Sequence, residues 1–125
     1  MRDYTELPAL QYFVLEESWV LGITARPGSL EIEIDLTFAR DHPELRPPRQ
    51  GDQIYGRVGL IRFTSVSSLD WSGQGNPPAI DASGERDWGA IDSFTWDAAT
   101  YELTGDFGRI RVDAALVESL LTGPV

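Results

Sequence analysis

The chain has 125 residues, of which 42% are hydrophobic and 24% charged, a composition typical of one globular domain spanning residues 1–125. Its 20 acidic and 10 basic residues give a net charge of −10, which argues against binding to nucleic acid or to anionic membranes. It has no cysteine and no lysine, since all ten basic residues are arginine, so thiolate and lysine chemistry are excluded. No apolar run of about 20 residues is present, so we expect a soluble, cytoplasmic protein.

Residues 19–38 predict a β-hairpin. Apolar side chains alternate with polar ones over residues 30–38, and the apolar positions are Leu30, Ile32, Ile34, Leu36 and Phe38. This period of two predicts a strand with one buried face. Residues 19–23 predict its partner strand, and Pro27-Gly28 suits the type II turn between them. Centring the hairpin there pairs Ile23 with Ile32, Leu21 with Ile34 and Trp19 with Leu36.

The polar face of this strand holds three carboxylates, Glu31, Glu33 and Asp35. Aligned carboxylates repel one another unless solvent or arginine disperses their charge. We interpret them first as protection of an exposed sheet edge against unwanted pairing. The alternative is an acidic face on which a basic protein partner docks, because such charges accelerate the encounter with a basic protein.

Residues 54–63 and 65–71 predict two further strands, in which Gly56 and Gly59 indicate a bulge or a close approach of two backbones. The flanking segments 41–53 and 72–87 are rich in proline and glycine and predict loops. The first loop and its edge form the only basic cluster, a candidate for holding an anionic group or for neutralising the second loop. Its members are Arg40, Arg46 and Arg49, beside the single histidine, His42.

Residues 89–117 predict a three-stranded meander with strands near 89–96, 100–105 and 109–117. A four-residue loop at 97–100 pairs Trp96 with Tyr101, and a second loop at 105–108 sets Glu102 opposite Arg111. A short helix over 113–121 is the alternative to the last strand. Taken together, the elements predict an all-β fold, an antiparallel β-sandwich or open barrel of about seven strands.

The segment between Trp71 and Gly89 is the candidate binding site, because long loops in compact domains are usually functional and tryptophan and arginine are enriched where partners dock. Its candidate binding residues are Trp71, Gln74, Asn76, Asp81, Glu85, Arg86, Asp87 and Trp88. They suit a sugar or, through oxygen ligands, Ca²⁺. The alternative is that both tryptophans anchor the loop to the core while the carboxylates form a solvated acidic surface.

No motif in the chain specifies catalysis. The single histidine has no Gly-x-Ser-x-Gly serine to activate, and with no cysteine a zinc site is disfavoured. Asp81, Glu85, Asp87 and Asp92 could in principle serve a small carboxylate-dependent hydrolase, but 125 residues leave little room for a substrate cleft beside a core. We therefore expect no enzyme, no bound metal and no cofactor.

Three stretches together carry a family resemblance: residues 15–21 (LEESWVL), 81–89 (DASGERDWG) and 94–108 (FTWDAATYELTGDFG). They resemble small uncharacterised bacterial all-β proteins, some of which look like immunity proteins encoded near polymorphic toxins. The resemblance covers nearly the whole chain and implies a non-enzymatic role without assigning a functional residue. The sequence thus predicts a protein-binding domain, such as an acidic stoichiometric inhibitor or immunity-type protein, as a monomer or homodimer. The alternative is a sugar- or Ca²⁺-binding β-sandwich that uses the 71–89 loop.

Overall fold

The computed structural model describes residues 1–40, 56–77, 79–80 and 86–123, and these form an all-β fold. Its elements are β1 (Arg2–Asp3), the 3-10 helix η1 (Tyr4–Glu6), β2 (Phe13–Arg26), β3 (Ser29–Phe38), β4 (Gly56–Ser72), β5 (Ala79–Ile80), β6 (Arg86–Asp87), β7 (Ile91–Asp97), β8 (Thr100–Gly105) and β9 (Gly108–Leu121). In this described part of the chain, no helix is long and apolar enough to cross a membrane.

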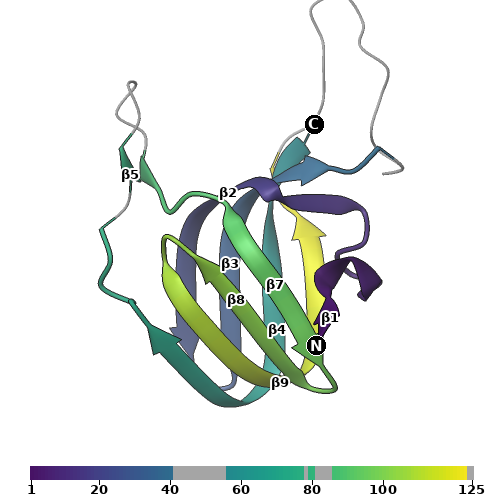
Figure 1. Cartoon of the computed structure of the whole chain (residues 1–125), viewed down its shortest axis with the longest axis vertical. Helices are drawn as coiled ribbons and strands as arrows, with labels where there is room; N and C mark the ends of the chain where they lie inside the picture. Colours follow the sequence, from purple (N-terminus) through teal and green to yellow (C-terminus); the bar gives the residue numbers. More distant parts are fainter. Residues whose placement is uncertain (41–55, 78, 81–85, 124–125) are drawn as a thin grey trace, which may run out of the picture.

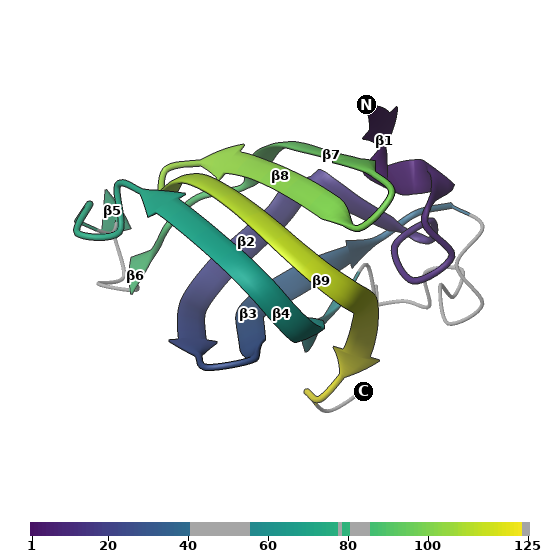
Figure 2. The same cartoon turned by 90° about the horizontal axis from the view of Figure 1, so that it is seen from below.

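Seven strands form one open antiparallel sheet in the order β1-β7-β8-β9-β4-β3-β2, while β5 and β6 pair separately. The sheet folds over on itself, so that β7, β8 and β9 lie in front of β2, β3 and β4 in Figure 1. The view from below shows β4 and β9 crossing between the two layers (Figure 2). The predicted fold class, all-β with about seven antiparallel strands, is confirmed.

The bend of β4 lies where the sequence predicts a break between two strands. Ser65 has a φ of 52°, which is rare for a residue other than glycine, and the pairing of β4 with β9 shifts just after it, between Val66 and Ser68. The backbone N–H of Val66 donates to the carbonyl oxygen of Gly28 in the β2–β3 turn, at 3.0 Å. The two predicted strands are therefore one long strand, bent at the point where it passes from one layer to the other.

The β2–β3 hairpin keeps its predicted turn but changes register. Ile23 pairs with Ile32 as predicted, but the pairings of Leu21 with Ile34 and Trp19 with Leu36 are wrong. A bulge between Val20 and Gly22 shifts the register by one residue, so Val20 pairs with Ile34 and Trp19 with Asp35. Because successive side chains point to opposite faces, Val20 is fully buried and Trp19 is 51% exposed.

The predicted meander is confirmed in its register. Trp96 pairs with Tyr101 and Glu102 pairs with Arg111. The final segment is strand β9 through Leu121, so the helix alternative over 113–121 is wrong. The close approach predicted at Gly56 and Gly59 is also present. A Cβ atom at Gly56 would overlap the backbone oxygen of Leu36, and one at Gly59 would overlap that of Leu120.

Aromatic rings fill the space between the two layers. Phe63 packs 5.2 Å from the ring centre of Tyr101 and 6.1 Å from that of Phe94, and Tyr4 lies 6.1 Å from Phe94. The Tyr4 hydroxyl donates to the Glu16 carboxylate and accepts from the Leu15 N–H, both at 3.1 Å. Burial, and then the bond to Glu16, raise the pKa of Tyr4 above its ordinary value. The interior is a packed core, so any binding site lies on the outside.

Candidate functional site

One pocket gathers three of the predicted binding residues. Trp71 at the end of β4, Gln74 just after it and Trp88 before β7 line a cavity of about 190 Å³, together with Ile23 and Phe107. Its lining residues come from the region where the chain leaves β4 and from the β8–β9 turn. Both segments are on the left side of Figure 1. Backbone hydrogen bonds hold this wall together, because Trp88 N–H donates to the Val20 oxygen and Val20 N–H to the Gly89 oxygen, both at 2.9 Å.

Both pocket tryptophans also anchor the chain. The indole N–H of Trp71 donates to the backbone oxygen of Phe107 at 2.9 Å, and that of Trp88 to the backbone oxygen of Asn76 at 3.1 Å. Asn76 in turn donates from its side chain to the backbone oxygen of Asp106 at 3.1 Å. Each ring is half-buried and packs against the core. The anchoring interpretation and the pocket are therefore compatible, since the polar atom of each ring is occupied while part of the ring still lines the cavity.

The remaining residues of the predicted loop divide into two groups. Asp87 accepts a hydrogen bond from the Gly89 N–H at 2.7 Å, and its strand β6 pairs with β5, so the segment is not wholly irregular. Asp81 and Glu85 lie outside the described residues, as does the side chain of Arg86 and the basic segment 41–53. Among the residues that the structure describes, no cluster of three or more histidine, aspartate or glutamate side chains could hold a metal ion. The Ca²⁺ hypothesis gains no support from the described part of the loop.

Sequence reasoning missed Ile23 and Phe107 in the pocket wall. The sequence pattern predicts Ile23 only as part of the hairpin and residues 105–108, which include Phe107, only as a turn. A fully apolar aromatic residue in a four-residue turn was a usable signal, because such a ring needs something to bury it. Phe107 is 1% exposed and folds back over Gly105, which brings the turn against the end of β4.

The second candidate site is the outer surface of the layer that contains β3, which we call the β3 face. Its outward side chains are Trp19, Glu31, Glu33, Asp35, Leu60, Arg62, Leu116, Glu118 and Leu120. The interpretation of the carboxylates as edge protection is wrong, because β3 lies between β2 and β4 and is not an edge. No other described strand or helix packs over this face (Figure 2).

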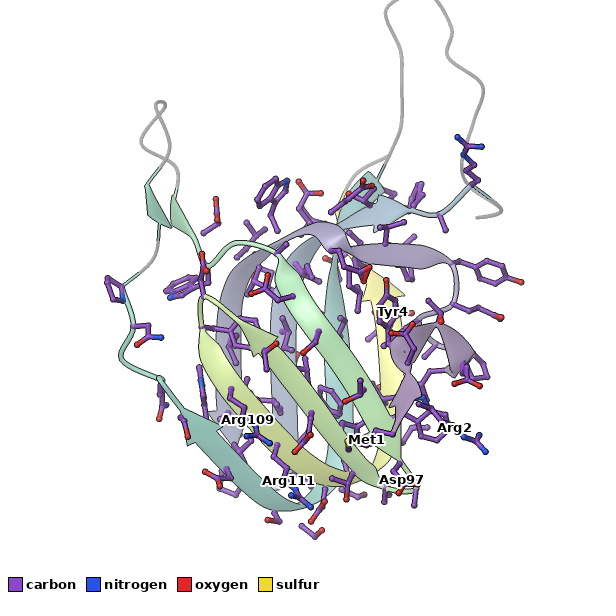
Figure 3. The ribbon with its side chains drawn as sticks, in the orientation of Figure 1. Met1, Arg2, Tyr4, Asp97, Arg109 and Arg111 are labelled. Carbon is purple, nitrogen blue, oxygen red and sulfur yellow. The ribbon has the colours of Figure 1, made fainter. Side chains whose placement is uncertain are left out.

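Charge on the β3 face is only partly compensated. Arg62 lies 3.5 Å from both Glu31 and Glu118, so one cation serves two carboxylates. Within the described portion of the chain, no ion pair involves Glu33 or Asp35, and both side chains are exposed. The opposite layer differs, because there Arg109 and Arg111 of β9 lie 2.9 Å and 3.8 Å from Glu102 (Figure 3). Among its described residues, the β3 face therefore carries four carboxylates, Glu31, Glu33, Asp35 and Glu118, against the single cation Arg62.

Apolar side chains lie among these carboxylates. Trp19 is the cross-strand neighbour of Asp35, and Leu60 stands between Glu33 on one side and Leu120 on the other. Leu116 and Leu120 are 53% and 36% exposed. Exposed apolar groups that share a face with charged ones mark interaction surfaces more often than singly scattered apolar groups do.

A scan against protein-family models, a search of curated proteins and a search of solved structures each find no match.

Proposed function

We propose that the protein is a non-enzymatic protein-binding domain that docks a basic partner on the β3 face, as an acidic stoichiometric inhibitor or immunity-type protein does. The observation that carries this proposal is Trp19, which is 51% exposed beside Asp35, a carboxylate with no ion pair among the described residues. Tryptophan is the residue type most enriched among those that dominate binding energy at interfaces. An aromatic anchor beside free carboxylates suits a partner surface that presents arginine or lysine around an apolar pocket.

The β3 face is large enough for a specific interface. Four strands spaced about 4.8 Å apart, each about ten residues long at about 3.3 Å per residue, give a surface of roughly 19 by 33 Å. One partner in a standard protein–protein interface buries about 800 Å², which is of the same order. Apolar and charged contacts alternate across the face, because Glu31, Glu33 and Asp35 on β3 lie between Trp19 on β2 and the pair Leu60 and Leu120 on β4 and β9.

The net charge of the chain supports the choice of a basic partner. Ten excess negative charges attract a cationic protein over a distance set by the ionic strength, about 8 Å at physiological salt. The free carboxylates Glu33 and Asp35 then act at contact distance. Association should therefore weaken as salt rises, and mostly through a slower encounter. The resemblance to immunity-type proteins points to the same class of function.

Site-specific photo-crosslinking in the source cells tests the proposal. A photoreactive amino acid replaces Trp19 in one version of the full chain and Arg109, which lies on the opposite layer and is 63% exposed, in a matched control. We expect a stoichiometric adduct with one basic protein from position 19 and none from position 109. No adduct from position 19, or equal adducts from both positions, contradicts the proposal.

The captured partner is then purified and its affinity for the full chain measured by calorimetry over a salt series. Removing both free charges with Glu33→Gln and Asp35→Asn should raise the Kd at least tenfold at low salt. The control is Asp70→Asn, an exposed carboxylate on the opposite layer, which should leave the Kd unchanged. If the Kd changes neither with salt concentration nor with the double substitution, the proposal is wrong.

A further inference from the structure

The Trp71–Trp88 pocket is a separate feature from the β3 face and is shaped for a small group. Its volume of about 190 Å³ corresponds to roughly six water molecules, at about 30 Å³ each. Pockets for drug-sized ligands start near 300 Å³. The cavity therefore suits the head of a ligand rather than a whole cofactor or an oligosaccharide.

The chemistry of the walls narrows the ligand class. Both indole N–H groups already donate to backbone oxygens, of Phe107 and of Asn76, so neither is available to a ligand. Of the five described side chains that line the cavity only Gln74 is polar, and Ile23 and Phe107 add apolar surface to the two rings. What the tryptophans offer a ligand is ring surface, and the electron-rich face of an indole attracts cations more strongly than that of any other side chain.

Two carboxylates stand beside this aromatic wall. Asp87 accepts from the Gly89 N–H at 2.7 Å, and a Cβ atom placed on Gly89 would lie 2.6 Å from Asp106 Oδ2. Both carboxylates thus lie close to Gly89, the residue that follows Trp88. In the described portion of the chain, no ion pair involves either of them. Each carboxylate directly precedes a lining residue in the chain, Asp87 before Trp88 and Asp106 before Phe107. A cation in the pocket would therefore contact the rings with two negative charges nearby, while a neutral sugar would use only the rings and Gln74.

We propose that this pocket binds an alkylated ammonium group. Such a group is apolar enough to pack against the tryptophan rings, needs no hydrogen-bond donor from the wall, and carries the charge that Asp87 and Asp106 complement. The group can come from a free small molecule such as choline or from a trimethylated lysine side chain of a peptide. The two sources share the headgroup, and the experiment separates them.

Calorimetric titration of the full chain distinguishes a cation site from an apolar one. The probes are choline chloride and its neutral isostere, 3,3-dimethylbutan-1-ol, with methyl glucoside as the sugar arm, all at constant ionic strength. We expect choline to bind at least tenfold more tightly than the neutral alcohol and the glucoside not to bind. Equal binding of choline and the alcohol, preferential binding of the glucoside, or no saturable binding of any probe overturns the proposal. A trimethyl-lysine peptide that binds at least tenfold more tightly than choline assigns the peptide source, and the reverse assigns the free molecule.

Matched variants locate the site. Trp88→Phe keeps an aromatic wall but weakens its attraction for a cation, and should raise the choline Kd severalfold. Trp96→Phe is the control, because Trp96 is also a half-buried tryptophan whose N–H bonds a backbone oxygen, that of Asp3, but it does not line the pocket. Asp106→Asn alters only an exposed carboxylate and should weaken choline severalfold while leaving the neutral alcohol unchanged. If Trp88→Phe does not fold, the comparison of choline with the neutral alcohol in Asp106→Asn still tests whether the pocket binds a cation. Equal effects of Trp88→Phe and Trp96→Phe, or no effect of Asp106→Asn, would place the cation elsewhere.

Discussion

Replacing Gly59 with alanine tests the close approach of β4 and β9 that sets Leu60 beside Leu120 on the β3 face. Gly59 is buried, and a Cβ atom there would overlap the backbone oxygen of Leu120 and lie 3.0 Å from Leu36 Cδ1. The backbone oxygen belongs to a paired strand and cannot move unless the two strands separate. The methyl group therefore has to be accommodated by spreading the sheet.

Two opposing terms set the size of the effect. Forcing an extra methyl group into a packed site costs about 1–3 kcal/mol. Alanine also restricts the unfolded chain more than glycine does, which stabilises by about 0.4–1 kcal/mol where the native backbone accepts it. We expect Gly59→Ala to lower the free energy of unfolding by about 1–2 kcal/mol. Gly22→Ala is the matched control, because a Cβ atom there meets nothing within 4 Å and its φ is not positive, so only the stabilising term remains.

Urea unfolding followed by tryptophan fluorescence measures both variants, with the slope of the transition checked to be unchanged. For a chain of this length 1 kcal/mol corresponds to a Tm shift of about 4 °C, so the two variants should shift the Tm in opposite directions. If Gly59→Ala is as stable as the unaltered protein, or gains stability as Gly22→Ala does, β4 and β9 do not approach as described. The Leu60–Leu120 pair of the proposed interface would then lose its structural basis.

Three further predictions test the register of β2, the ion pairs of Arg62 and the dependence of stability on the ionisation of Tyr4. Val20→Thr should lower the free energy of unfolding by about 1–3 kcal/mol, because it would bury a hydroxyl group in fully apolar surroundings. If urea unfolding shows no change in stability, Val20 does not face the core, and the register without a bulge would be correct. Arg62→Gln should cost less than about 1 kcal/mol and the loss should vanish in high salt, since both its ion pairs are partly exposed; a loss that persists in high salt would mean that Arg62 stabilises by packing. Burial, and then the bond to Glu16, raise the pKa of Tyr4 above 10.0, so the unfolded chain releases this proton at lower pH than the folded chain does. The contribution of Tyr4 to stability should therefore be constant below pH 10 and fall above it. Tyr4→Phe should make that alkaline decline shallower in urea midpoints measured from pH 7 to 11, and an unchanged decline would contradict the assignment.

Most of the sheet could be predicted because local signals agreed. In the meander, each loop length and the side-chain parity on both sides independently give the same pairing, for example Trp96 with Tyr101. The alternation over 30–38 likewise admits one buried face, and the structure buries it. The glycines of β4 also signalled close backbone contact before any strand order was known.

The register of β2 and the composition of the pocket could not be predicted for physical reasons. Trp19, Val20 and Leu21 are all apolar, so the hydrophobic pattern fits either face of the strand. The choice is made by contacts distant in sequence, the two backbone hydrogen bonds between Val20 and residues 88–89. The pocket likewise combines Ile23, Trp71 and Phe107, which lie on three separate parts of the chain, and only the fold brings them together.

The bulge in β2 matters for the proposed function as well as for the fold. In the predicted register Trp19 would fill the core beside Leu36, and the outer side of β3 would present carboxylates with no large apolar neighbour on β2. A purely acidic strip attracts cations but offers little area to desolvate, so it steers partners without holding them. The one-residue shift instead places Trp19 beside Asp35 and sends Val20 inward to replace it. An apolar anchor and free charge thus share one surface, which is the combination that a tight interface with a basic protein requires.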